Sequence, residues 1–292
     1  MQDMTLMVLT ARPDLASNRR LVEAGRAAGL DVRLEDALTV VVGCGERRAR
    51  SGDGRNLLEP APEAVLPRVG NWRPESLLAV LEALMAAGVR SPNAPGPIRD
   101  GRDHWRTMLR LRAAGLPAPR TLAGADPEAL AAGAADLLGF PVVVKQRRSR
   151  MGVGVIRCDR KDQLDAVLDS LWRVGDEVIV QELIPTGGAS LRLLVAGGEV
   201  AAAARFTASD GEWRSNAARG AAVEGYDPSP EEVRLALRGA AALRLGVCGV
   251  DLFPGKRGTV IGEVNPTPGF RHLEAATGID VAAAIIQATI TS

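Results

Sequence analysis

The chain has 292 residues, of which 46% are apolar and 3% aromatic, with 36 basic and 35 acidic residues. This length can form a core for two or three small domains, and the balanced charge gives no electrostatic basis for binding nucleic acid or an acidic membrane surface. Three widely spaced cysteines and two histidines argue against a disulfide framework and against a zinc site built on several His or Cys residues.

The N-terminal part of the chain alternates short apolar runs with helical periodicity. We expect strands at 5–10, 31–34, 38–42 and 64–69, and helices at 17–26 and 74–88. Ser17 is the expected N-cap of the first helix, and Pro74 opens the second, where proline is favoured. This order predicts a small parallel-sheet α/β domain over residues 1–95. The segment 91–97 contains three prolines and a glycine, which predicts an extended connector.

The rest of the chain is predicted to form two α+β blocks. Asp100 is the expected N-cap of a helix that ends at residue 114, and Asp126 that of a helix that ends at Gly139. Ser229 and Glu232 form a capping-box pattern. The other expected helices are 161–172, 229–245 and one from 280, and the expected strands are 141–146, 177–184, 191–195, 200–206, 249–253 and 259–264. We divide this part into a central subdomain, 96–180, and a C-terminal subdomain, 181–292.

The first candidate site is Lys145, at the end of a β-branched strand, with the loop that leads to Gly152 and Gly154. A buried ammonium group needs an anion nearby, and glycines allow backbone N–H groups to approach phosphate oxygens. The pattern therefore favours a phosphate site. An edge-strand lysine before a hairpin turn fits the same residues equally well.

The second candidate site combines Asp251 with Glu263 and Asn265, each in an otherwise apolar strand. The short turn between the strands predicts antiparallel neighbours, and alternation places Glu263 and Asn265 on one face, which Asp251 can oppose. Two carboxylates and an amide repel without a cation, and an all-oxygen set suits Mg²⁺ or Mn²⁺. The alternative is a solvated charged face, which the apolar strands disfavour.

The third candidate site contains Arg192, Arg214, Asn216 and Arg219. Guanidinium groups and an amide beside a carboxylate site suit a polyanionic substrate, because the arginine fork matches phosphate and carboxylate oxygens. In a chain with 33 arginines, any one of them is more often a surface residue. Their joint placement favours a binding site.

Several motifs appear in a familiar order along the chain. They are Lys145, the Gly-x-Gly loop, Gln181-Glu-Leu-Ile184, Arg214-Ser-Asn216 with Arg219-Gly220, Asp251, and Glu263-Val-Asn-Pro-Thr-Pro-Gly269. Together they resemble the ATP-grasp enzymes and, within them, the RimK-type group. That group adds glutamate to the C-terminus of ribosomal protein S6 and includes relatives that ligate amino acids to small molecules. The resemblance extends from residue 64 to the C-terminus and is weakest before it.

The resemblance implies an ATP-grasp fold, with a pre-ATP-grasp domain followed by two α+β subdomains that sandwich ATP. It implies an ATP-dependent carboxylate–amine ligase that joins an amino acid, with glutamate as a candidate, to an amine. Such an enzyme makes an acyl phosphate and releases ADP and phosphate. The acceptor would be a small molecule or a peptide or protein tail, and a dimer or tetramer is expected. No nucleic-acid partner, membrane span or secretory signal is expected, which predicts a cytoplasmic protein.

The resemblance also assigns roles to residues. Asp251, Glu263 and Asn265 would hold Mg²⁺ or Mn²⁺, and the catalytic arginines would be Arg192, Arg214 and Arg219. The backbone of Glu182 and Leu183 would meet adenine. The nucleotide-binding set as a whole is His104, Lys145, Gly152, Gly154, Gln181, Glu182, Leu183, Ile184, Ser190, Arg214 and Asn216.

Three positions depart from the family pattern. His104 stands where a second phosphate-binding lysine is usual, Ser149-Arg150 stands where the loop usually has Gly-Ser or Gly-Thr, and Ser190 replaces an aspartate. These changes support a second hypothesis, a degenerate ATP-grasp sensor or scaffold without turnover. A dinucleotide-binding oxidoreductase is a third, but Gly152-x-Gly154 lacks the third glycine and lies outside the opening β-α unit.

Overall fold

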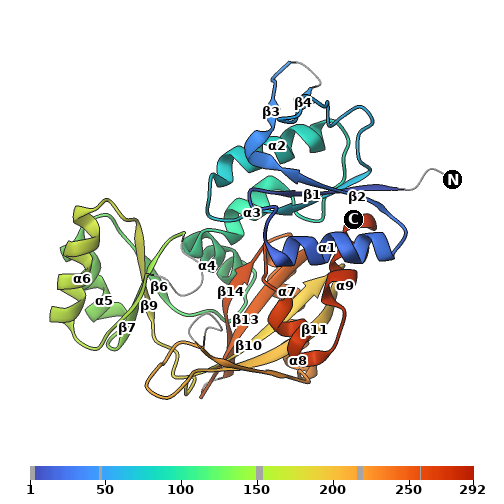
Figure 1. The fold of residues 1–292 in the computed structure, drawn as a ribbon. Coiled ribbons are helices and arrows are strands. Elements are labelled where there is room, and N and C mark those ends of the chain that lie inside the picture. The colour runs from blue at the N-terminus through green and yellow to red at the C-terminus, as the bar shows by residue number, and fades with distance from the viewer. Residues whose placement is uncertain (1–3, 46–47, 149–153, 216–219, 257) are drawn as a thin grey trace.

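The structure is a computed structural model that describes residues 4–45, 48–148, 154–215, 220–256 and 258–292 (Figure 1). Three sheets of three or more strands organise these residues, with strand orders β2-β1-β5, β6-β9-β7-β8 and β12-β11-β10-β13-β14. Over the described part of the chain, no helix combines the length and the apolar character needed to cross a membrane.

The N-terminal unit is the predicted parallel sheet, in which β1 pairs with β2 and β5. Its elements are β1 (Thr5–Thr10), α1 (Ala16–Ala27), β2 (Asp31–Asp36), η1 (Ala37–Thr39), β3 (Val41–Val42), β4 (Ala49–Arg50), β5 (Ala64–Arg68) and α2 (Pro74–Ala86). Two local predictions are wrong. Leu15, not Ser17, is the N-cap of α1. Residues 37–39 form a 3₁₀ turn because the Asp36 side chain accepts a hydrogen bond from the Leu38 N–H.

The segment after α2 is also more helical than predicted. Helix α3 (Pro95–Gly101) begins inside the expected connector, because proline at the first helical positions has a suitable φ and no N–H that needs a partner. Asp100 therefore lies within α3 and caps nothing. The N-cap of α4 (His104–Ala113) is Asp103, whose side chain accepts hydrogen bonds from the N–H groups of Trp105 and Arg106.

A second unit, here the small lobe, spans residues 121–182 and stands away from the rest of the molecule in Figure 1. It contains β6 (Thr121–Ala123), α5 (Pro127–Leu137), β7 (Val142–Gln146), β8 (Val155–Cys158), α6 (Lys161–Arg173) and β9 (Val178–Glu182). All neighbouring strands are antiparallel. Buried residues of α5 and α6 pack with Val142 and Val144 of β7. Because side chains alternate along a strand, Val143 and Lys145 lie on the opposite face of the sheet.

The third unit is the five-stranded antiparallel sheet, here the large sheet. It contains β10 (Ala189–Ala196), β11 (Glu199–Thr207), β12 (Ala222–Gly225), α7 (Pro230–Ala242), β13 (Val247–Gly255), β14 (Gly258–Asn265), α8 (Arg271–Thr277) and α9 (Val281–Ile290). Leu191 and Leu193 of β10 join a core with α4 and α7, whereas Leu194 joins a core with α1, α8 and α9. The alternation of β10 thus buries both faces of the sheet.

The capping box of α7 gives a stability prediction. The Ser229 hydroxyl accepts from the Glu232 N–H, and the Glu232 carboxylate accepts from the Ser229 N–H at 2.8 Å. We expect Ser229→Ala to lower the free energy of unfolding by about 1 kcal/mol, because an orphan N–H loses its acceptor. Urea denaturation measures this change. Ser170→Ala, in the exposed interior of α6, is the control and should change stability little; equal effects would show that the cap contributes nothing.

Candidate active site

Lys145 lies at the end of β7, a strand bordered by both β9 and β8, so the edge-strand interpretation is wrong. Its Nζ donates a hydrogen bond of 2.7 Å to Gln181 Oε1 on β9. Burial lowers the pKa of Lys145, while Glu263 and Asp251 raise it. Those two carboxylates belong to the large sheet. The lysine of the small lobe is therefore close enough to the carboxylates of the other sheet for their charges to interact, which is the central feature of this site.

The acidic residues lie in register across the large sheet. Asp251 on β13 pairs directly with Glu263 on β14, and Gly249 pairs with Asn265, as the antiparallel prediction requires. On the other side of β13, Arg192 of β10 pairs with Asp251. The Arg192 guanidinium binds Asp251 in a bidentate manner, with Nε to Oδ1 at 2.7 Å and Nη2 to Oδ2 at 2.6 Å. One row of charges thus crosses three neighbouring strands.

The charges in this row are strongly coupled. Burial raises the pKa of Asp251 even though Arg192 lowers it. Burial also opposes the charge on Arg192, but Asp251 and Glu263 together raise the pKa of the guanidinium. The side-chain carboxylate of Glu263 has no hydrogen-bond or ion-pair partner among the described residues. An unpaired carboxylate beside a paired one is the kind of site where a cation lowers the free energy most.

The donor set fits a hard cation. Asn265 Oδ1 accepts from the Thr267 N–H at 2.9 Å, and the Thr267 hydroxyl is buried with no hydrogen-bond partner in the described structure. The residues described contain no cluster of three His, Cys, Asp or Glu that could hold a metal, so a site here depends on the amide of Asn265 beside the two carboxylates. Carboxylate and amide oxygens suit Mg²⁺.

Arg214 is held by its own loop and by the small lobe. Its guanidinium makes a bidentate pair with Glu212, at 2.9 and 2.8 Å, and donates to the carbonyl of Val155 on β8 at 3.1 Å. The hydrogen bond from Arg214 lowers the pKa of Glu212 to about 2. Ser215 donates to the Ser190 hydroxyl at 2.6 Å, which joins this loop to β10. The predicted residues Gly152, Asn216 and Arg219 lie outside the described residues.

The backbone directly after β9 offers an open donor at Ile184. The Glu182 N–H donates to the Arg120 carbonyl at 3.0 Å, and the Leu183 N–H to the Pro141 carbonyl at 3.4 Å. The Arg120 N–H donates to the Glu182 carboxylate at 2.7 Å. The Ile184 N–H donates to no described acceptor. Ile184 thus presents a backbone N–H without a described acceptor beside Glu182 and Leu183, whose expected contact with adenine stays a prediction.

Two further predicted residues border the loop after β7. Gly154 has φ +69°, and a Cβ on it would lie 2.8 Å from Gln146 Oε1, so both the backbone and the space favour glycine here. His104 is the first residue of α4, and its N–H donates to the Arg147 carbonyl at 2.9 Å. The structure thus places His104 at the start of this loop.

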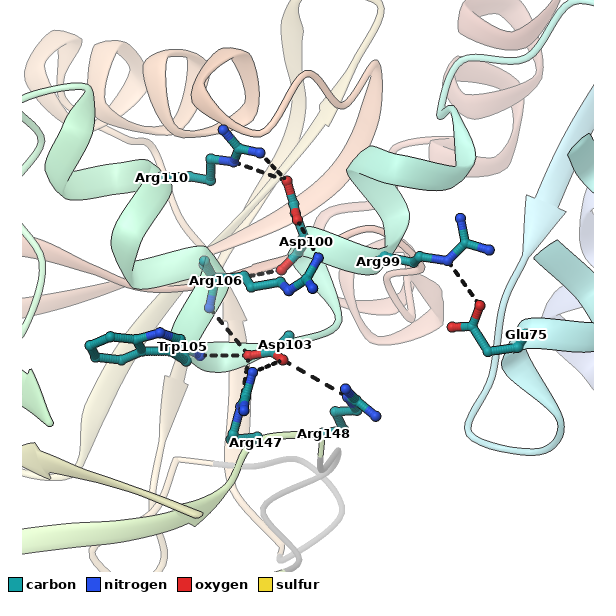
Figure 2. Close-up of polar contacts among 10 residues, drawn as sticks. Glu75, Arg99, Asp100, Asp103, Trp105, Arg106, Arg110, Arg147 and Arg148 are labelled. Atoms are coloured by element: carbon teal, nitrogen blue, oxygen red, sulfur yellow. Dashed lines mark hydrogen bonds and ion pairs between the residues drawn. The ribbon is translucent and has the colours of Figure 1, made fainter. Parts of the chain in front are cut away.

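Sequence reasoning missed Asp103 and Glu212. Asp103 is buried and binds the Arg147 side chain at 2.7 Å (Figure 2). Its signal was the helix-capping pattern, which we assigned to Asp100. Glu212 lies two residues before the arginine that it binds, a spacing too common to single out.

A small lobe that holds a lysine over a row of carboxylates on a second antiparallel sheet defines the ATP-grasp class of enzymes. Residues 101–289 match the model of the RimK-like ATP-grasp domain, and residues 4–98 match that of the RimK pre-ATP-grasp domain. The chain belongs to the RimK-like ATP-grasp family. It is accordingly an ATP-dependent carboxylate–amine ligase that forms C–N bonds.

Curated relatives cover nearly the whole chain. A probable alpha-L-glutamate ligase of Xanthomonas euvesicatoria pv. vesicatoria is 37% identical over 292 residues, 97% of this chain and 96% of the relative. One of Marinomonas sp. is 34% identical over 286 residues, 97% of this chain and 94% of the relative.

Solved structures show the same fold. The RimK domain ATP-grasp protein of Sphaerobacter thermophilus has a TM-score of 0.75 at 25% identity, over 97% of this chain and 98% of that chain. The ATP-grasp ligase PsnB, complexed with a phosphomimetic variant of a minimal precursor, Mg and ADP, has a TM-score of 0.74 at 25% identity, over 99% and 98%.

Proposed function

We propose that this ligase forms an amide bond between glutamate and a peptide-type acceptor, using ATP with Mg²⁺. The observation that carries the proposal is the electrostatic interaction of Lys145 with Asp251 and Glu263 of the other sheet, which supports a phosphate and cation site between the lobes. Glutamate is supported by relatives named alpha-L-glutamate ligases, and a peptide acceptor by a PsnB structure that contains a precursor. Mn²⁺ is a possible substitute, because its ligand preferences are the same.

Each side chain has a distinct proposed role. Asp251, Glu263 and Asn265 hold the cation, which when bound neutralises phosphate charge. Lys145 binds a phosphate oxygen, and Gln181 orients it through the hydrogen bond of 2.7 Å. The backbone of the β9 segment, with the Ile184 N–H, meets the adenine edge. With the proposed boundaries after residues 95 and 180, Lys145 belongs to the central subdomain, and the other side chains named here belong to the C-terminal subdomain.

The reaction needs no protein nucleophile. A carboxylate oxygen of one substrate attacks the γ-phosphorus, the bond from the γ-phosphorus to the β-phosphate oxygen breaks, and ADP leaves. The amine of the other substrate then attacks the acyl carbon, loses a proton, and phosphate departs. We propose that Arg214 and Arg192 offset negative charge as it develops, which is where electrostatic stabilisation has its largest effect. Arg192 can do so only while its pair with Asp251 keeps it in place.

The test is ADP formation with amino acids and acceptors offered in pairs. We expect Mg²⁺-dependent ADP release with glutamate and a peptide pool, and a product whose mass has increased by glutamate residues. Small-molecule amines replace the peptide pool in a parallel arm and distinguish the two acceptor classes. Binding of Mg·ATP without ADP release for any pair would replace the ligase by the sensor hypothesis.

A further inference from the structure

Asp103 connects the rest of the molecule to the small lobe beside the active site through its ion pair with Arg147. Helix α4 contributes Met108 and Leu111 to the core beneath the large sheet, and it also contacts β6 of the small lobe. Its N-cap, Asp103, faces Arg147, the residue that directly follows β7 of the small lobe. The Asp103 side chain is 3% exposed and that of Arg147 is 23% exposed. The pair is therefore largely shielded from water, where charges interact most strongly.

Both oxygens of Asp103 bind Arg147, but only Oδ1 also caps the helix. Oδ1 accepts the capping hydrogen bonds from the N–H groups of Trp105 and Arg106, at 3.0 and 3.2 Å, and a longer one from Arg147 Nε at 3.4 Å. Oδ2 accepts from Arg147 Nη2 at 2.7 Å and lies 3.8 Å from Arg148 Nε. Figure 2 shows Arg147 and Arg148 converging on this carboxylate.

A neighbouring carboxylate, that of Asp100, forms ion pairs with two arginines of α4. Asp100 binds Arg106 at 3.3 Å and Arg110 at 2.9 Å, on the far side of the α3–α4 corner (Figure 2). The side chains of α4 thus have their own counter-charge. Oδ2 of Asp103 is directed to the other lobe.

Arg147 is held by two backbone hydrogen bonds and by two ion pairs of its side chain, one with Asp103 and one with Glu177 of the small lobe at 3.6 Å. Its N–H donates to the Glu177 carbonyl within the small lobe at 2.9 Å, and its carbonyl accepts from the His104 N–H of α4 at 2.9 Å. Its side chain binds Asp103. Lys145 lies on β7, only two residues before Arg147. A shift of Arg147 therefore also moves the Lys145 ammonium group.

We propose that Asp103 is a positioning residue: by holding Arg147 across the lobe boundary, it sets where Lys145 and the start of the following loop meet the nucleotide phosphates. This inference rests on the nucleotide site of the proposed function. A charged pair with one bidentate partner fixes direction as well as distance, which a lone backbone hydrogen bond does not. Asp103 itself touches neither nucleotide nor substrate in this scheme.

Asp103→Asn separates positioning from folding. Asparagine caps helices as well as aspartate does, so its Oδ1 can keep the bonds to Trp105 and Arg106. Its Nδ2 then faces the Arg147 guanidinium, donor against donor, and the ion pair is lost. We expect Mg·ADP to bind roughly tenfold more weakly and the KM for ATP to rise by a similar factor, with the KM for the amino acid unchanged.

Asp126→Asn is the matched control. Asp126 caps α5 of the same lobe, accepts from the Ala129 N–H at 2.7 Å, and is exposed. It should leave Mg·ADP affinity unchanged. If Asp103→Asn behaves like this control, or raises both KM values equally, Asp103 is only a helix cap and the inference is wrong.

A second variant tests the pair itself. Arg147→Gln should weaken Mg·ADP binding as Asp103→Asn does, and the double variant should be no weaker than either single one, because both remove the same contact. Arg147→Lys, which keeps the charge, should recover part of the affinity. Additive losses would contradict a shared role. Failure of the unaltered protein to bind Mg·ADP would instead overturn the proposed function, so the two failures are distinguishable.

Discussion

Glu263→Gln is expected to abolish amino-acid-dependent ADP release. Glu263 lies opposite Asp251 on the large sheet, and its charge raises the pKa of Lys145 in the other lobe. The Glu263 carboxylate has no hydrogen-bond or ion-pair partner among the described residues. Glutamine keeps the shape and one oxygen but removes the negative charge that a hard cation needs. Since that charge offsets the phosphates during transfer, we expect kcat to fall by roughly a thousandfold. Coupled assay of ADP at saturating Mg²⁺ measures the loss.

The matched control for Glu263→Gln is Cys158→Ser. Cys158 is fully buried on β8, and burial raises the pKa of its thiol, so it supplies no reactive thiolate near neutral pH. We expect ADP release within about twofold of the unaltered enzyme, measured well below the unfolding temperature because a buried hydroxyl costs some stability. A Glu263→Gln variant with near-normal kcat and unchanged Mg²⁺ dependence would remove Glu263 from the cation site.

Local pattern predicted the parts of the site that lie on one hairpin. The short turn predicts that β13 and β14 are antiparallel neighbours, but its register alone would place Gly262 opposite Asp251. A shift between Asp251 and Leu252 brings Glu263 to that position. The sequence pattern does not reveal this register shift. The shift depends on tertiary packing, because the Phe253 ring lies 2.2 Å from the place of a Cβ on Gly262 and leaves room only for glycine. A sequence shows such a glycine but not the ring that requires it.

The wrong prediction of the N-cap of α4 involves two equivalent local signals. Asp100 and Asp103 both precede helical residues, and local capping chemistry fits either one. The packing of α3 decides between them, because the Cβ position of Gly101 is 3.0 Å from Pro266, far away in sequence. For the same reason the approach of Lys145 to Asp251 across two sheets could not be derived from spacing. It was available only through resemblance to a family.

Lys145→Arg tests whether this site requires an ammonium group and not merely a positive charge. The Lys145 Nζ is held 2.7 Å from Gln181 Oε1 between the two sheets, and burial lowers its pKa. A guanidinium is broader and planar, so it cannot occupy the position of a compact ammonium without displacing Gln181 or the phosphate. We expect kcat/KM for ATP to fall by roughly a hundredfold although the charge is kept.

The chain offers a matched control for Lys145→Arg, because it has only three lysines. Lys161, at the start of α6, is exposed and pairs with Asp165 at 2.8 Å, a contact that arginine can also make. Lys161→Arg should therefore leave kcat/KM for ATP within about twofold, as exposed pairs contribute little. If Lys145→Arg matched this control, the lysine would act only as a charge and its proposed contact with phosphate would be wrong. A loss confined to Lys145→Arg, with Mg·ADP binding weakened in parallel, would place the ammonium at the nucleotide.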